Sequence, residues 1–346
     1  MYNPIDTGVH ATLHPRSGDA TPGAGVAVER LMYASQCCIA GPVFGEMHRI
    51  REHALQRNVA DQVHVALLHQ SGWFMEWLEG PTQGVRAVMA RVARDPRHRG
   101  VKLIHQSRGP RRLTEPWSMA IVQARDAPAD FARRVAALRA EHLGGQVMEP
   151  AAVWRRLSTP LAHPGAALQA MNDQFQRVMV CSAQGTGSFD MVRWLGQTHG
   201  AEVVHRRFAG ARAEALDVAT DYVDLDVGAV VRRVIAMARN GLEIGLTQAF
   251  LVDYSHAILV LCGDSARDRE LMQRLVAACA GLAHRPVVVG LGRPSVDHRG
   301  LQRLAHAGGL VYLDCDLAGV VDAETLWAAA EPALDFSLAA HSAWPG

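Results

Sequence analysis

The chain has 346 residues, 49% of them hydrophobic and 20% charged, a balance that favours two globular domains over a disordered chain. Its formal net charge of +1 gives no reason to expect a nucleic acid or an anionic membrane as a partner. No apolar run reaches the roughly 20 residues that a transmembrane helix needs. Residues 1–27 lack the pattern of a secretory signal, so we expect a flexible tail there and a cytoplasmic protein.

Residues 28–123 alternate between strand-like and helix-like patterns. The first helical pattern is expected to end at Asn58, a residue that often caps helices. Two strand-like runs then flank Ser71 and Gly72, which are typical of a hairpin turn. The predicted order β-α-β-β-α-β-β describes a ferredoxin-like α+β domain, with two helices on one face of a four- or five-stranded sheet.

Five landmarks in this segment occur in an order that resembles the BLUF family, which senses blue light with FAD. They are LMYAS with Tyr33 and Ser35, then Asn58, FMEWLEG with Glu76, RDPRH with Arg94 and Arg97, and PWSM with Trp117 and Met119. The resemblance implies the BLUF fold, and FAD as the cofactor.

The resemblance also implies a role for each landmark. Tyr33 would donate an electron to the excited flavin, and Asn58 would hydrogen-bond the polar edge of the flavin ring. Trp117 and Met119 would lie on the strand that relays the change. The cofactor-binding residues implied in this way are Tyr33, Ser35, Asn58, Glu76, Arg94, Arg97, Trp117 and Met119.

Two positions depart from the family pattern. Glu76 stands where the family has an essential glutamine, and an ionised glutamate only accepts hydrogen bonds. A protonated glutamate still donates, and burial raises the pKa of a carboxyl group. Val65 stands where the family usually has glycine, and its branched side chain enters the space of the cofactor. These departures predict impaired photochemistry and leave open whether FAD is kept or lost.

The remaining side chains of the FMEWLEG segment have ordinary structural interpretations. Trp73, Phe74 and Trp77 are expected to serve packing rather than cofactor contacts. Glu79 and Gly80 are expected to end a strand and begin a helix, where a carboxylate favours the helix N-terminus.

Residues 124–173 contain two helical patterns, followed by the segment STPLAHPGA, which is rich in proline and small residues. BLUF proteins commonly carry capping helices at this place, whereas the plain alternative is a pair of packing helices. The Pro-rich segment predicts a domain boundary, with the second domain at residues 174–346.

From residue 174 onward, buried-type strands alternate with amphipathic helices, which predicts a mainly parallel α/β domain of the Rossmann or P-loop-like class. This half weakly resembles a small GTPase of the bacterial gliding-motility type. The phosphate-binding pattern falls on Ser182, Gly187, Ser188 and Phe189, where Ser182 replaces its first glycine, Ser188 its lysine and Phe189 its hydroxyl residue. The guanine-reading motif is also absent, so we expect a pseudo-GTPase without nucleotide hydrolysis.

We therefore expect a sensory or regulatory protein that is not an enzyme and that signals by contact with a regulatory protein of unknown identity. A homodimer is a further expectation from the resemblance. Two alternatives stay open: a flavin-free interaction scaffold, and a nucleotide-binding enzyme that uses the loop at residues 184–187 or the carboxylates Asp224, Asp226 and Asp264.

Overall fold

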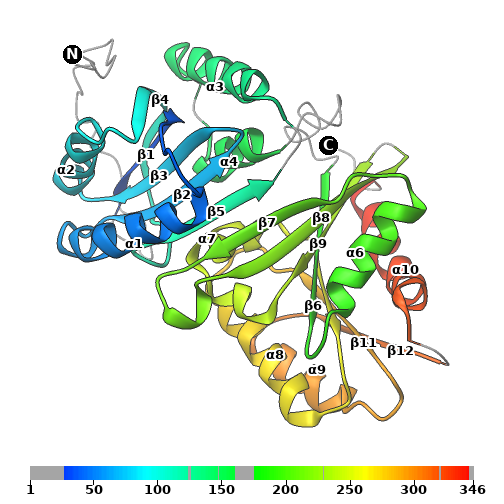
Figure 1. Cartoon of the computed structure of the whole chain (residues 1–346). Helices are drawn as coiled ribbons and strands as arrows, with labels where there is room; N and C mark the ends of the chain where they lie inside the picture. The colour runs from blue at the N-terminus through cyan, green and yellow to red at the C-terminus, as the bar shows by residue number, and fades with distance from the viewer. Residues whose placement is uncertain are drawn as a thin grey trace. The chain divides into compact units, whose positions relative to one another are not determined.

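The computed structural model describes residues 27–123, 126–146, 148–159, 175–228, 230–318 and 321–342. The chain divides into two compact units, Met1–Ala167 with Ala209–Ala213, and Leu168–Phe208 with Glu214–Gly346 (Figure 1). The predicted tail at 1–27, apart from its last residue, and the Pro-rich boundary segment after residue 159 lie outside the described residues. Within the described residues, no helix is long and apolar enough to cross a membrane.

The first unit begins with the predicted order β-α-β-β-α-β-β, which is confirmed. Its sheet has the strand order β5-β2-β3-β1-β4, in which β2 and β5 run parallel and the other neighbours antiparallel. The elements are β1 (Val28–Cys37), α1 (Val43–Ala60), β2 (His64–Gln70), β3 (Trp73–Gly80), α2 (Thr82–Val92), β4 (His98–Gly109), β5 (Ser118–Gln123), α3 (Pro128–Leu143) and α4 (Pro150–Ser158).

Two local predictions in this unit have different outcomes. The β2–β3 hairpin turns at Ser71 and Gly72, and both residues have the positive φ that a two-residue turn of type I′ requires. The predicted helix end at Asn58 is wrong, because α1 continues to Ala60 and its C-cap is Asp61. Asn58 is instead a buried residue of the last turn, so its side chain faces the interior rather than capping the helix.

The two faces of the first unit's sheet pack against different helices. Because side chains alternate along a strand, Phe74 faces the core that also contains residues of α1 and α2. On the opposite face, Trp73 stacks on Phe131 of α3 with ring centroids 5.9 Å apart. The ring centroids of Trp77 and of Trp154 in α4 are 6.4 Å apart. The expected packing role of these aromatic residues fits this arrangement.

In the part of the second unit that the structure describes, the strands lie in the order β12-β11-β10-β6-β9-β8-β7. Five neighbouring strands from β12 to β9 run parallel, whereas β8 and β7 are antiparallel. Its main elements are β6 (Phe175–Ser182), α6 (Gly187–Thr198), β7 (Val204–Ala209), β8 (Val218–Val227), β9 (Val230–Met237), α7 (Gly245–Phe250), β10 (His256–Val260), α8 (Ser265–Ala278), β11 (Val287–Gly292), α9 (His298–Ala307), β12 (Tyr312–Asp316) and α10 (Ala323–Ser342).

Helices cover both faces of this second sheet. Residues of α6 and α10 share one core with the strands, and residues of α8 and α9 share the other. The strands β7 and β9 escaped prediction. In β9, Arg232 and Arg233 interrupt the apolar run, yet both side chains are buried. The charge of Arg233 is neutralised by an ion pair with Asp224. The Rossmann or P-loop-like class stays a prediction for this unit.

Candidate functional site

Three of the predicted site residues lie in one row across the first sheet. Tyr33 of β1 is paired with Glu76 of β3, Glu76 with Leu67 of β2, and Leu67 with Met119 of β5. Because directly paired residues of neighbouring strands project to the same face, this row faces the core shared with α1 and α2. The sheet register therefore brings Tyr33, Glu76 and Met119 together from three strands.

A short hydrogen bond joins the first two members of this row. The Tyr33 hydroxyl donates to Glu76 Oε2 over 2.5 Å. Tyr33 is fully buried, whereas Glu76 keeps 7% of its surface exposed. Burial raises the pKa of Tyr33 well above its usual value, and the neighbouring Glu76 carboxylate raises it further. Tyr33 therefore stays protonated at neutral pH and acts as a hydrogen-bond donor.

Burial also raises the pKa of Glu76, from its ordinary 4.5 to about 7. The hydrogen bond from Tyr33 and the charge of Arg91 lower this pKa, and the charge of Asp95 raises it. Near neutral pH the carboxyl group is thus close to half protonated. Since Tyr33 donates to Oε2, a proton on Oε1 would leave the carboxyl able to donate a hydrogen bond of its own.

A second polar pair lies beside the row. Ser35 Oγ is 2.8 Å from His98 Nδ1, and the His98 ring packs 5.0 Å from Phe74 and 6.0 Å from Tyr33. Burial lowers the pKa of His98 to about 4, so the ring is neutral at pH 7. Sequence reasoning used His98 only as a landmark of the RDPRH segment. Its place against Tyr33 follows from the pairing of β1 with β4.

Asn58 and Trp117 are both buried, as cofactor-contacting residues would be. Trp117 immediately precedes β5 and shares the core with Val65 and Tyr33. Its indole Nε1 is buried and has no hydrogen-bond partner among the described residues. A buried N–H group without a protein partner is uncommon, so this indole N–H is available to a ligand or a water molecule.

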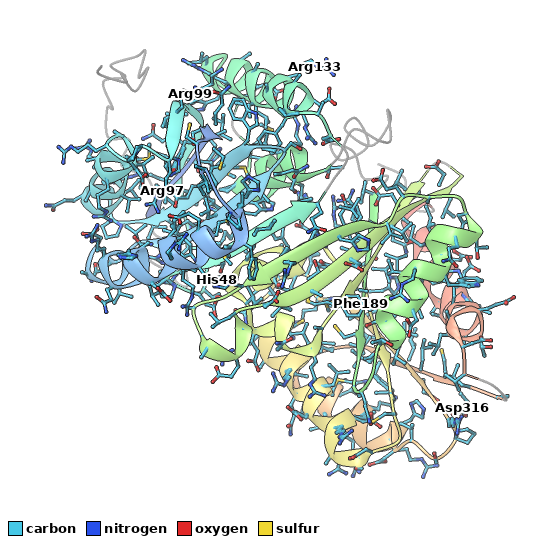
Figure 2. The ribbon with its side chains drawn as sticks, viewed as in Figure 1. His48, Arg97, Arg99, Arg133, Phe189 and Asp316 are labelled. Carbon is cyan, nitrogen blue, oxygen red and sulfur yellow. The ribbon has the colours of Figure 1, made fainter. Side chains whose placement is uncertain are left out.

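The two predicted arginines lie apart from this core. Arg97, labelled in Figure 2, donates through Nε to Asp95 at 2.9 Å and through a terminal nitrogen to Glu46 of α1 at 3.1 Å. Its charge is thereby neutralised by two carboxylates. Arg94 is exposed. Cofactor roles for Arg94 and Arg97 stay predictions, and the described contacts of Arg97 are with the protein itself.

Val65 occupies the space that the sequence comparison associates with glycine. It is fully buried in β2, paired with Leu78, and two residues from Leu67 on the same face of the sheet. Its branched side chain therefore fills part of the core beside the Tyr33–Glu76 row.

The expected strand end is confirmed, since β3 ends at Gly80, but the expected role of the Glu79 carboxylate at the helix N-terminus is wrong. This carboxylate accepts the backbone N–H groups of Arg112 and Leu113 at 2.6 and 2.8 Å, and the indole N–H of Trp77 at 3.1 Å. The helix α2 begins at Thr82 without a side-chain cap. The Glu79 carboxylate instead accepts hydrogen bonds from backbone N–H groups about 34 positions along the chain. No local sequence pattern indicates such a long-range contact.

In the second unit, the candidate carboxylates do not form one site. Asp224 pairs with Arg233 through two hydrogen bonds of 2.7 Å within the sheet. Asp264 is the N-cap of α8, and accepts the backbone N–H groups of Ala266 and Arg267. Both carboxylates thus have structural partners, so a shared catalytic role for them has no support.

Residues 28–120 match the family model described as BLUF, sensors of blue-light using FAD. The matched segment is about a quarter of the chain and contains the Tyr33–Glu76 row. No curated protein matches the chain. The resemblance of the second unit to a small GTPase finds no support among the matches.

Solved BLUF proteins align with the first part of the chain. A BlsA photo-activated state has 14% identity, covers 38% of this chain and 91% of its own, with a TM-score of 0.28. The BlrB dark-state structure has 20% identity, covers 34% and 86%, with a TM-score of 0.25. A bacterial light-regulated adenylyl cyclase has 10% identity, covers 70% and 87%, with a TM-score of 0.25. We draw no conclusion from alignments with scores this low.

FAD is the cofactor that the family description names, and the side chains of the row suit such a ligand. The indole N–H of Trp117 lacks an acceptor among the described residues, and a protonated Glu76 offers a second donor. An isoalloxazine ring presents acceptor oxygens and nitrogens that both donors suit. The buried Val65 side chain adds bulk to the same core.

Proposed function

We propose that the first unit is an FAD-based blue-light sensor in which a protonated Glu76 takes the place of glutamine. The observation that carries this proposal is the 2.5 Å hydrogen bond from Tyr33 to Glu76 inside the segment that matches the BLUF model. The raised pKa of Glu76 supports it, because only the protonated carboxyl group donates a hydrogen bond onward.

Tyr33, Glu76 and Trp117 have separate tasks in this proposal. When bound, FAD supplies the absorption of blue light and the capacity to accept an electron. Tyr33 is the buried phenol beside Glu76, and its proton already points at Oε2. Loss of electron density from the phenol makes its proton more acidic, so the hydrogen bond to Glu76 strengthens. Rotation of the Glu76 carboxyl group then changes which neighbouring atom accepts its hydrogen bond.

The output we propose passes through β3 and β5. Glu76 is followed in β3 by Trp77, which faces α4, so a change at Glu76 reaches the opposite face of the sheet within one residue. On the other side, Leu67 separates Glu76 from Met119 of β5. A regulatory protein, or a second copy of the chain, would read this change by contact.

For the second unit we propose a regulatory role without nucleotide chemistry. Ser182 Oγ accepts the backbone N–H of Ser188 at 2.8 Å, so this amide is already satisfied where a phosphate loop would hold its ligand. Asp268 likewise accepts the N–H groups of Cys262 and Gly263 after β10, at 2.9 and 3.0 Å. These side chains leave fewer donors for an anion than a working phosphate loop has.

The experiment that tests the sensor is an absorption spectrum of the purified full chain incubated with excess FAD, in the dark and after blue illumination. Bound flavin with a reversible red shift supports the proposal. Bound flavin without a shift favours a redox sensor, and absence of flavin binding favours the interaction scaffold.

Nucleotide addition tests the second unit. A bound nucleotide stabilises the folded chain by RT ln(1 + [L]/Kd), which is about 2.7 kcal/mol at a hundred times Kd. We expect no change in the melting temperature with GTP or ATP and magnesium. A concentration-dependent rise would contradict the proposal and favour the enzyme alternative.

A further inference from the structure

The segment Arg111–Leu113, between β4 and β5, is fastened to the sheet by contacts from two other strands. The backbone N–H groups of Arg112 and Leu113 both donate to Glu79 Oε2, at 2.6 and 2.8 Å. Glu79 is fully buried at the end of β3. Two amide donors on a single carboxylate oxygen define the position of this segment relative to β3.

Further contacts hold the same segment. The Arg111 guanidinium donates to the backbone carbonyl of Glu79 at 2.8 Å and to that of Gln62 at 3.0 Å. His64 Nδ1, at the start of β2, lies 2.6 Å from the backbone carbonyl of Leu113. Leu113 is itself almost fully buried. We call Arg111–Leu113 with Glu79 and His64 the β5 latch.

The carboxylate of Glu79 also contacts Trp77, which lies on the same face of the sheet two residues earlier in β3. Its other oxygen, Oε1, accepts the indole N–H of Trp77 at 3.1 Å. Trp77 in turn packs against Trp154 of α4. Glu79 thus joins three donors, two from the latch and one from the tryptophan that contacts α4.

The latch lies directly upstream of the proposed sensor residues. Trp117 follows Leu113 by four positions, and Met119 follows it by six. Met119 is paired with Leu67, which is next to Glu76 in the row. Because side chains alternate along a strand, a one-residue slip of β5 would turn Trp117 and Met119 away from Glu76.

We propose that Glu79 is a positioning residue that sets the register of β5 and thereby places Trp117 and Met119 in the core next to Leu67, the neighbour of Glu76 in the row. The inference rests on the proposed sensor function for the importance of those two residues. The placement itself depends only on the contacts of the latch, so it is testable without flavin.

The chemistry of the three donors makes a carboxylate necessary at this position. A glutamine at position 79 has one acceptor oxygen and an NH₂ group that only donates. If the glutamine oxygen accepts the latch amides, its NH₂ group faces the N–H of Trp77. In the reverse rotamer the oxygen accepts from Trp77 and the NH₂ group faces the latch amides. In either rotamer the latch amides lose their charged acceptor, because they face a neutral amide oxygen or the NH₂ group, so Glu79→Gln loosens the latch. Adding Trp77→Phe removes the donor that the NH₂ group opposes and lets the amide oxygen stay on the latch.

The experiment measures amide hydrogen exchange by NMR in the full chain without added flavin. The variants are Glu79→Gln, Trp77→Phe and the double variant, with Glu52→Gln, an exposed change on α1, as the matched control. We expect Glu79→Gln to accelerate exchange at Leu113 and Met119 by roughly tenfold or more, as loss of a hydrogen bond to a charged group implies. Exchange in β1 should be unchanged.

The double variant separates positioning from general stability. Recovery of slow exchange at Leu113 in the double variant supports the inference, because a second substitution in the core would otherwise loosen the unit further. Uniform acceleration across β1, β3 and β5 in Glu79→Gln overturns it, as does unchanged exchange at Leu113.

A parallel flavin measurement keeps the two proposals distinct. If exchange at Leu113 and Met119 responds as expected but none of the variants binds FAD, the latch stands and the sensor function fails. If FAD binds and Glu79→Gln leaves both the dark flavin band and the exchange at Met119 unchanged, the sensor function stands and the latch inference fails.

Discussion

Replacement of Glu76 by glutamine should change how the stability of the protein depends on pH. The folded chain holds a proton on Glu76 up to a pH of about 7, whereas the unfolded chain releases it near 4.5. Between these values the folded state binds more protons, so this group's contribution to stability is complete below pH 4.5 and is lost as pH rises to about 7. Glu76→Gln removes this dependence, because a glutamine side chain does not titrate.

The magnitude follows from the difference between the two pKa values. Each pH unit of difference is worth about 1.4 kcal/mol, so the shift from 4.5 to about 7 corresponds to about 3 kcal/mol. At pH 5 the variant should be the more stable by only about 1 kcal/mol, because pH 5 lies just above 4.5 and a protonated carboxyl and an amide are alike in size and polarity. At pH 8.5 the variant should be the more stable by about 3 kcal/mol.

Other groups titrate in the same range, so the assay compares two proteins rather than one protein at two pH values. Burial lowers the pKa of His69 and His98 to about 4, and these rings make stability rise with pH. Urea unfolding of the parent and of Glu76→Gln from pH 5 to 8.5 cancels these shared contributions. Difference infrared spectra should show the protonated-carboxyl band of Glu76 disappearing over the same range.

One result would refute the reasoning. If the difference in unfolding free energy between the parent and Glu76→Gln is constant from pH 5 to 8.5, Glu76 does not titrate near neutral pH. A protonated Glu76 could not then act as the donor in the sensor. Glu52→Gln, on the exposed side of α1, serves as the control and should show no such pH-dependent difference.

Three further predictions concern individual side chains. Val65→Gly should raise the fraction of purified chain that carries FAD, measured by the ratio of flavin to protein absorbance, and equal occupancy would remove the steric reasoning. Trp154→Ala should lower the free energy of unfolding by about 3–5 kcal/mol, because Trp154 is buried against Trp77; a loss below 1 kcal/mol in urea unfolding would show that α4 packs loosely. Asp224→Asn should destabilise the second unit by about 3–5 kcal/mol, because it leaves Arg233 buried with its paired carboxylate removed; an unchanged melting curve would contradict this.

The sequence alone determined the order of elements in the first unit and the place of its hairpin turn. Both depend on local chemistry: the spacing of apolar residues sets the elements, and Ser71 with Gly72 accepts the positive φ of the turn. The ordered landmarks also placed Tyr33 and Glu76 together among the residues implied to bind the cofactor. Pairing of β1 with β3 then brought these residues within 2.5 Å.

Sequence reasoning failed where a partner lies far along the chain. His98 lies 63 positions from Ser35, and the amide donors to Glu79 come from 33 and 34 positions away. Strand β9 was missed because a local pattern counts the charge of Arg232 but does not include its partner Asp335, which lies 103 positions along the chain. Burying a polar group costs free energy unless hydrogen-bond or ion-pair partners compensate it, and only the tertiary fold supplies those partners.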